Sequence, residues 1–187
     1  MLDWYGDNVP QMVDGDLKVI SAPIDFLGIN YYTRRIIAHD DAGDFISTRR
    51  IRYPFVPHAA YEEWEINPEA LYRLIMRVHR DYQPPAIYVT ENGTPLDDVV
   101  DEDGFVRDPV RIDYLRRHFA AVWQAIQEGA DVKGYFVWSF MDNFEWNLGR
   151  TKRFGVVYTD YESQARTVKD SGRWYSKVIR SNSVRES

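Results

Sequence analysis

Carboxylic acids and aromatic residues gather directly after two apolar runs of this sequence, in places suited to chemistry. Glu91 follows the run Ile87–Thr90, and residues 138–146, after a longer run, hold two tryptophans and two acids. A carboxylate can act as a nucleophile or as an acid or base. Aromatic rings pack on the C–H faces of sugars, and indole N–H and phenol O–H groups bind hydroxyls. With 15% aromatic residues, the chain has either a sugar site or a tryptophan-rich core.

Each of these features also has an ordinary structural interpretation. Asn-Gly is a strong turn signal, so Glu91-Asn92-Gly93 taken alone is more typical of a turn than of a site. Asn30-Tyr31-Tyr32 taken alone is an ordinary aromatic strand end. The segment 138–146 is harder to explain in this way, because it puts two acids and two tryptophans into nine residues after an apolar strand.

The elements that must position these residues are three strands and three helices. Apolar runs predict strands over residues 24–32, 87–90 and 132–140. Asn67 and Asp108 are expected N-caps, each followed by a proline, and Ser171 is expected to cap a last helix. The predicted apolar stripes are Leu71, Leu74, Ile75 and Val78 in the first helix, and Ile112, Leu115, Phe119, Val122 and Ile126 in the second, which ends at Gly129.

The alternation of strands and helices predicts the fold class. Strands that are apolar on both faces indicate a parallel sheet in an α/β protein. No glycine-rich phosphate loop is present, so the sequence favours part of a (β/α)8 TIM barrel, its last three βα units. Functional residues of such barrels lie at the C-terminal ends of the strands. Residues 38–66, 94–107 and 141–153 are expected loops, 154–158 an extended stretch, and 181–187 a polar tail.

Composition excludes several classes of function. A net charge of −6 without a basic face argues against nucleic acid, and no run of 18 apolar residues could span a membrane. The four histidines show no paired ligand spacing, so we expect no metal site and no cofactor. Cysteine is absent and the first residues are unlike a signal peptide, which favours a reducing, cytoplasmic location.

Several separated motifs, taken together, resemble the C-terminal half of family 1 glycoside hydrolases, the β-glucosidase family. The motifs occur in the family's order between about residues 22 and 180. They are Phe26–Thr33 (FLGINYYT), Thr90–Gly93 (TENG), Trp138–Trp146 (WSFMDNFEW), Arg153–Gly155 (RFG), and Lys169–Ser171 (KDS) before Trp174-Tyr175. The resemblance implies that residues 1–187 are the C-terminal portion of a single barrel domain.

The resemblance also implies roles for individual residues. Glu91 matches the family nucleophile, and Tyr32 matches the tyrosine that bonds and orients it. Asn30 matches a residue that helps to bind the sugar 2-hydroxyl. The remaining matches are to residues around the sugar: Trp138 as platform, Glu145 and Trp146 at the outer hydroxyls, Phe154 as an aromatic wall, and Trp64 on the aglycone side.

These residue types suit retaining hydrolysis of β-glucosides. One carboxylate attacks the anomeric carbon while an acid about 5–5.5 Å away protonates the leaving oxygen. A hydroxyl donor such as Tyr32 favours the ionised nucleophile. Glu145 can accept hydrogen bonds from two sugar hydroxyls, and its charge would repel a phosphate, so nonphosphorylated substrates are expected.

The acid/base partner is not recognisable in this sequence. In the family it lies in an Asn-Glu-Pro motif on an earlier strand, and that motif does not occur here. We therefore expect an enzyme that needs the N-terminal half of the barrel as its partner. The alternative is a noncatalytic half-barrel that binds sugar or self-associates. Residues 57–63 depart from the family pattern before Trp64, so the sequence does not predict the aglycone.

Overall fold

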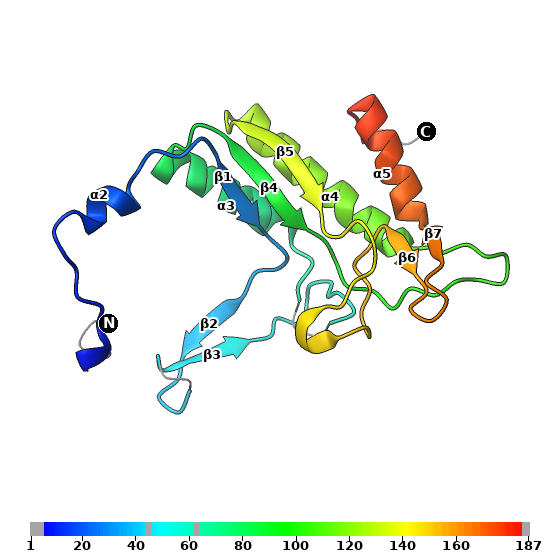
Figure 1. Cartoon of the computed structure of the whole chain (residues 1–187), viewed down its shortest axis with the longest axis horizontal. Coiled ribbons are helices and arrows are strands. Elements are labelled where there is room, and N and C mark those ends of the chain that lie inside the picture. Colours follow the sequence, from blue (N-terminus) through cyan, green and yellow to red (C-terminus); the bar gives the residue numbers. More distant parts are fainter. Residues whose placement is uncertain (1–5, 44–45, 62–63, 185–187) are drawn as a thin grey trace.

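A three-stranded parallel sheet forms the centre of the chain in a computed structural model, which describes residues 6–43, 46–61 and 64–184. Its strands are β1 (Leu27–Asn30), β4 (Ile87–Asn92) and β5 (Val132–Val137), in that order across the sheet. The three arrows point the same way in Figure 1. The predicted α/β class and parallel pairing are confirmed, and the C-terminal ends of all three strands meet at one edge.

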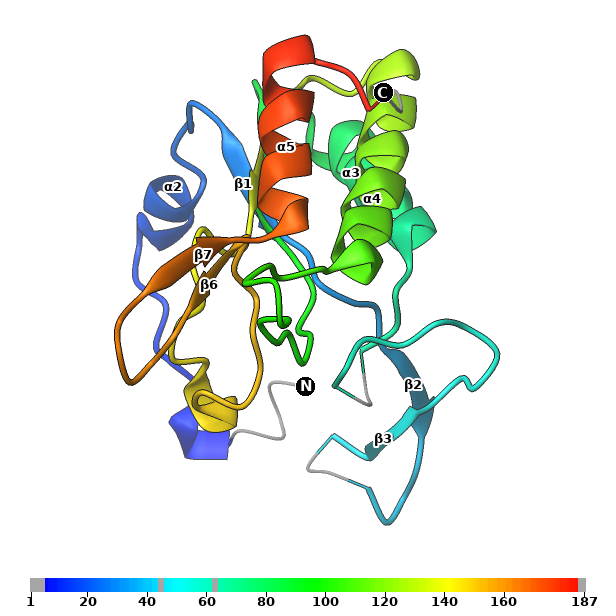
Figure 2. The same ribbon diagram turned by 90° about the vertical axis from the view of Figure 1, so that its right-hand side faces the viewer.

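Three long helices follow the strands in the predicted order. They are α3 (Pro68–Tyr82), α4 (Pro109–Gln127) and α5 (Asp170–Ser181). Helices α3 and α4 cover one face of the sheet, and α5 packs beside α4 (Figures 1 and 2). Helices α3 and α4 thus return the chain from β1 to β4 and from β4 to β5, and α5 follows β5 as the last described element.

The helix starts agree with the sequence in part. The Asn67 side chain accepts the Ala70 N–H at 3.0 Å, which confirms the predicted cap of α3. Asp108 occupies the N-cap position of α4, but its side chain makes no capping bond there. It binds the backbone N–H of Ser171 at 2.8 Å instead. The prediction that Ser171 caps the last helix is wrong, because α5 begins at Asp170 with Lys169 at the N-cap.

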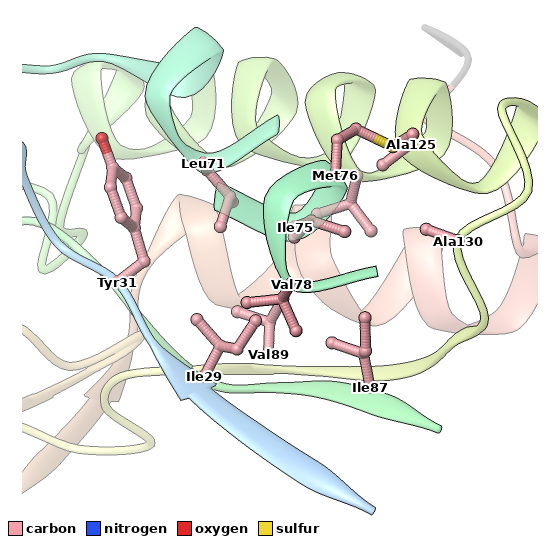
Figure 3. Packing of buried hydrophobic residues seen from close by; sticks show 11 residues of the cluster. Ile29, Tyr31, Leu71, Ile75, Met76, Val78, Ile87, Val89, Ala125 and Ala130 are labelled. Atoms are coloured by element: carbon pink, nitrogen blue, oxygen red, sulfur yellow. The ribbon is translucent and has the colours of Figure 1, made fainter. Parts of the chain in front are cut away.

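The core lies between the sheet and helix α3. Ile29, Ile87 and Val89 point from the strands toward Leu71 and Ile75 of the helix (Figure 3). Burying each such side chain stabilises the fold by roughly 1.5–3 kcal/mol. The predicted stripe of α3 is therefore confirmed as its buried face.

The buried face of α4 is rotated from its predicted stripe. Leu115 and Val122 are buried as expected, whereas Ile126 is 41% exposed. The rest of the buried face is made of Arg111, Tyr114, His118, Ala121 and Ala125. The stripe was wrong in part because Arg111 and His118 are buried through hydrogen bonds and ion pairs, which apolar periodicity does not register.

No described helix covers the opposite face of the sheet. Phe136 of β5 is 56% exposed, and Phe26 is 53% exposed with its ring 5.1 Å from that of Tyr88. The N-terminal segment, with η1 (Gly6–Asn8) and α2 (Asp16–Ile20), extends away from the sheet (Figure 1) and buries no residue in either helix.

Two of the predicted strands are longer than the observed ones. Pairing begins at Leu27, whose partner is Ile87, so residues 24–26 have no neighbouring strand. Strand β5 ends at Val137, and a cis peptide bond joins Trp138 to Ser139 immediately afterwards.

Two hairpins lie where loops or a single extended stretch were expected. Strands β2 (Ile36–His39) and β3 (Thr48–Ile51) pair antiparallel near the start of the predicted loop 38–66. Strands β6 (Val157–Thr159) and β7 (Arg166–Val168) form the second hairpin, and η2 (Trp146–Leu148) lies in the predicted loop 141–153. Among the described helices, none is both long and apolar enough to cross a membrane.

Candidate active site

The predicted site residues lie at the edge where the parallel strands end. Asn30 is the last residue of β1, Glu91 is the penultimate residue of β4, and Trp138 directly follows β5. Glu91 and Asn92 continue the strand, so the interpretation of this motif as a simple turn is wrong. In Figure 1 the segments that follow the three strands, among them the β2–β3 hairpin after β1, leave the sheet at this edge.

Glu91 and Tyr32 are in direct contact. The Tyr32 hydroxyl donates a hydrogen bond of 2.7 Å to Oε2 of Glu91, although the two residues are 59 positions apart. The backbone holds them together, because Asn30 pairs with Glu91 and the Tyr31 N–H bonds the Glu91 carbonyl at 2.9 Å. Burial, and then the hydrogen bond to Glu91, raise the pKa of Tyr32 well above its usual value. Tyr32 therefore stays a neutral donor to the carboxylate.

An aromatic cluster packs against the ring of Tyr32. The Tyr32 ring lies 5.2 Å from that of Trp64 and 6.2 Å from that of Phe154, and Trp64 lies 5.9 Å from Phe154. Phe154 is only 1% exposed. Its ring is buried against Tyr32 and Trp64, and its role as a wall facing the sugar stays a prediction.

Asn92 ties together the elements around Glu91, a role that the sequence did not suggest. Its amide is fully buried and donates to the Tyr31 carbonyl at 2.7 Å and to the Tyr114 hydroxyl at 2.9 Å. Tyr135 of β5 donates to the Asn92 side-chain oxygen. One side chain thus joins β1, β4, α4 and β5 next to Glu91.

Gly93 allows the chain after Glu91 to approach Trp138. A Cβ at position 93 would lie 1.9 Å from the Trp138 carbonyl oxygen. The Trp138 N–H also bonds the Asn92 carbonyl at 2.9 Å. Glycine is required here for close backbone contact between the ends of β4 and β5.

Asn30 lies on the uncovered face of the sheet. Its side-chain oxygen accepts a hydrogen bond of 2.6 Å from the Thr90 hydroxyl, and the residue is exposed. Asn30 and Glu91 are paired across neighbouring strands, so a ligand that reaches one is close to the other.

Glu145 lies on the loop that follows β5. Its Oε2 accepts a hydrogen bond of 3.0 Å from the Asn143 amide, and the charge of Glu145 contributes to the raised pKa of Tyr32. Trp146 is 84% exposed and Phe144 is 69% exposed. The structure therefore brings Glu145 near Tyr32, and it leaves the neighbouring aromatic rings exposed.

A buried cluster of charged side chains, which the sequence did not predict, joins the loops 94–107 and 141–153 to the starts of α4 and α5. It contains three acids and three bases: Asp98, Asp108, Asp142, Arg111, Arg153 and Lys169. The Lys169 ammonium is 2.5 Å from Asp98 and 2.8 Å from Asp142, and its side chain is fully buried. Sequence reasoning missed the cluster because its members come from four separate segments.

Metal binding has little support in the described parts of the chain. Within residues 6–43, 46–61 and 64–184, no three acidic or histidine side chains are grouped as metal ligands would be. The chemistry available at this edge is that of carboxylates, hydroxyls and aromatic faces.

Comparison with known proteins agrees with the geometry. Residues 3–184 match the sequence profile of glycosyl hydrolase family 1. Beta-glucosidase A of Thermotoga maritima is 46% identical over 187 residues, which are 100% of this chain and 41% of that protein. The bifunctional beta-D-glucosidase/beta-D-fucosidase of Bifidobacterium breve is 46% identical over 186 residues, with 92% of this chain and 40% of the relative covered.

Solved structures give the same picture. A beta-glucosidase from Thermotoga maritima in complex with castanospermine superposes with a TM-score of 0.91 at 45% identity, covering 99% of this chain and 41% of that one. The complex of a Thermotoga maritima beta-glucosidase with deoxynojirimycin has a TM-score of 0.86 at 48% identity, covering 91% and 38%. The chain thus spans about two fifths of the length of these relatives.

Proposed function

Because the chain belongs to glycosyl hydrolase family 1, we propose that it supplies the nucleophile side of a retaining β-glucosidase site, with Glu91 as the nucleophile. Family 1 glycosidases are (β/α)8 barrels, and the chain is part of one. The observation that carries the proposal is the 2.7 Å hydrogen bond between Tyr32 and Glu91 at the ends of neighbouring strands. A neutral donor at this distance fixes the orientation of the carboxylate.

The proposed reaction has two steps. The Glu91 carboxylate attacks the anomeric carbon, the bond to the leaving oxygen breaks, and an acid gives that oxygen a proton. In the second step the same group, now a base, takes a proton from water as the water oxygen attacks the anomeric carbon and the ester bond to Glu91 breaks. The Asn-Glu-Pro motif expected to carry this acid does not occur in the chain. We therefore assign the three βα units to the end of the barrel and the acid to the missing part.

Sugar binding is assigned to side chains around Glu91. Asn30, which is exposed beside it, is proposed to bind the 2-hydroxyl, and Glu145 to accept bonds from the outer hydroxyls. Trp138 is proposed as the platform, with Trp146 near the outer hydroxyls. The aglycone side is assigned to Trp64, and Phe154 is proposed to complete the aromatic wall.

The proposed substrates are nonphosphorylated β-glucosides, including cello-oligosaccharides. Relatives at 45–46% identity are named as beta-glucosidase A and 1,4-beta-D-glucan glucohydrolase, the latter from Thermotoga neapolitana. The negative charge of Glu145 would repel a phosphate at the outer hydroxyls, and Lys152, a cation of the same loop, is paired with Asp97 at 2.7 Å.

The test requires a complete barrel. We define the completed enzyme as this chain joined to the N-terminal segment of Thermotoga maritima beta-glucosidase A that precedes the matching region. A 2-deoxy-2-fluoro glucoside should form a stable ester with the completed enzyme, and peptide mapping should place the label on Glu91. Labelling of Glu145 or Asp142 would contradict the assignment.

A second candidate function is a noncatalytic half-barrel that binds sugar or associates with itself. The uncovered sheet face, with Phe136 more than half exposed, favours it for the isolated chain. The acid step contributes about 10²–10⁴-fold to such reactions, so the isolated chain should turn over cellobiose far more slowly than the completed enzyme does. Equal rates from both would exclude this second function and our placement of the acid.

A further inference from the structure

We propose that Asn143 is a positioning residue that aims the Glu145 carboxylate at the sugar, and that the buried charge cluster behind the loop holds Asn143 in place. The inference rests on the proposed sugar-binding role of Glu145. It adds a residue that touches neither the sugar nor Glu91, and it assigns a function to the ion pairs of Asp142.

Asn143 holds one of the two Glu145 oxygens directly. Its amide nitrogen donates to Oε2 at 3.0 Å. Its amide oxygen lies 3.1 Å from the Ser139 hydroxyl, which shares its one proton with the Met141 carbonyl at 2.8 Å. The amide is therefore held between Glu145 and Ser139. Oε1 of Glu145 has no hydrogen-bond partner among the described residues, so it is free to accept a sugar hydroxyl.

The position of Asn143 is fixed in turn by Tyr161 and Arg153. The Tyr161 hydroxyl donates to the Asn143 carbonyl at 3.0 Å. The guanidinium of Arg153 lies 4.7 Å from the centre of the Tyr161 ring and 3.9 Å from that of Tyr158. The same guanidinium donates to Asp142 at 2.7 Å, so Asp142 and Tyr161 are held against one another.

Asp142 connects this arrangement to the body of the protein. Its carboxylate is fully buried and accepts from Lys169 at 2.8 Å, from the Gly155 N–H at 2.9 Å and from the Thr159 N–H at 3.2 Å. With three acids and three bases, the cluster is electrically balanced. Removing one member would leave an uncompensated buried charge, which is strongly destabilising.

The outer part of the loop has little other support. Phe144 and Trp146, on either side of Glu145, are 69% and 84% exposed. The backbone of Glu145 is held within the loop itself, since its N–H bonds the Gly149 carbonyl at 2.7 Å and its carbonyl accepts from the Leu148 N–H at 2.8 Å. The Asn143 contact is therefore the side-chain link between Glu145 and the rigid cluster.

The decisive experiment is a double-mutant cycle in the completed enzyme. Asn143→Ala should lower kcat/KM for 4-nitrophenyl β-glucoside about 10-fold, the size expected when a bond to a charged group is lost. In an E145Q background the same substitution should cost less than about 2-fold, because contacting residues couple. A role only in loop stability would cost the same in both backgrounds and would overturn the proposal.

Two further variants and one binding measurement complete the test. Tyr161→Phe keeps the ring but loses the bond to Asn143. Its kcat/KM should therefore fall less than that of Asn143→Ala, with the same dependence on Glu145. This variant decides the question if Asn143→Ala does not fold. Asn147→Ala, in the exposed part of the same loop, is the control and should change nothing.

Binding of deoxynojirimycin, measured by calorimetry, does not depend on turnover. Asn143→Ala should weaken it about 10-fold, as it does kcat/KM. Binding without turnover by the unmutated completed enzyme would contradict the proposed function alone. The positioning role would be contradicted if the Asn143 variant bound deoxynojirimycin as tightly as the unmutated completed enzyme does. It would also be contradicted if the completed enzyme did not bind this compound at all.

Discussion

A hydroxyl that donates to a carboxylate also keeps its own proton more firmly, and Tyr32 shows both effects. Its pKa is raised, first by burial and then by the bond to Glu91. A tyrosine that stays neutral in this way donates to the carboxylate over the whole pH range in which such an enzyme would act. The aromatic contacts of its ring, with Trp64 and Phe154, hold the hydroxyl toward Glu91 rather than toward water.

Tyr32→Phe should therefore lower kcat of the completed enzyme by about 10- to 100-fold, since a hydrogen bond to a charged group contributes roughly 1.5–3 kcal/mol. Phenylalanine keeps the ring contacts, so the free energy of unfolding should change little. Tyr82→Phe, on a residue that is 71% exposed at the end of α3, is the matched control. An unchanged kcat in Tyr32→Phe would show that Glu91 is oriented by other groups.

Asn92 shows what residue-level sequence reasoning cannot find. The Asn-Gly pair predicted a turn because both residues tolerate left-handed backbone conformations. The structure uses Asn92 for its amide, which satisfies groups on β1, α4 and β5. Those partners are 22 to 61 residues away, so no local pattern indicated them.

Backbone contact between strand ends is the main constraint at the scale of elements. Gly93→Ala should lower the free energy of unfolding by about 1–3 kcal/mol, the usual cost of overpacking, because its Cβ would meet a backbone carbonyl that cannot rotate away. Gly28→Ala is the matched comparison. Its Cβ would lie 3.0 Å from the Thr90 side chain, which has more freedom, so the loss should be smaller. Denaturant unfolding of both variants measures the difference, and equal stability would show that the loop shifts freely.

Helix α4 contains a buried histidine that makes stability depend on pH. His118 is fully buried against Tyr114, and burial lowers its pKa from 6.5 to about 4. The unfolded chain binds a proton there below about pH 6.5, while the folded chain does not until about pH 4. Stability contributed by the neutral ring is therefore present above pH 6.5 and is lost as the pH falls toward 4.

His118→Phe should remove this dependence. The loss of unfolding free energy between pH 7.5 and pH 4 should shrink by about 3 kcal/mol, because each unit of pKa shift corresponds to about 1.4 kcal/mol. Urea titrations at pH 7.5 provide the internal reference, since His118 is neutral at that pH in both the folded and the unfolded chain. If the variant loses as much stability as the unmutated protein on acidification, carboxylates rather than His118 dominate the acid response.

The sequence predicted the helices better than the loops for a physical reason. Helix α3 has a cap, a proline and an apolar stripe within a few residues, and all three are local signals. The β2–β3 hairpin has no two-residue turn motif, and its register depends on contacts that a local pattern does not contain. The ion pairs of Lys169 reach back 27 and 71 residues, so the rigidity of the loops depends on distant partners.

At the scale of the whole molecule, the chain is part of a barrel, and the sheet of its described residues has two outer strands at its edges. Among these strands β4 is paired on both sides, whereas β1 and β5 each pair with β4 alone. A closed barrel has no such edges, and unpaired edges readily pair with other chains. The family relation and the coverage of about two fifths of the relatives both agree with a barrel to which further βα units contribute.

The isolated chain should therefore not persist as a soluble, well-packed monomer. The uncovered face exposes Phe26 and Phe136, and the segments beyond the sheet expose Ile20 and Phe140 at 77% and 70%. At about 25 cal/mol per Å², a few hundred Å² of exposed apolar surface costs several kcal/mol, which is comparable to the whole stability of a domain. Edge pairing and burial of this face both favour association with another chain.

Sedimentation at micromolar concentration measures this directly. The isolated chain should sediment as dimers or larger species, whereas the completed enzyme, in which the missing βα units cover the same edges, should sediment as a defined species with a sharp thermal transition. Phe136→Ser and Phe140→Ser, introduced together, should reduce the association of the isolated chain because they remove apolar surface. Phe55→Ser is the control, since Phe55 is 82% exposed and follows β3, outside the three-stranded parallel sheet. A clean 22 kDa monomer with a cooperative transition would mean that the described segments stabilise the open sheet without a partner.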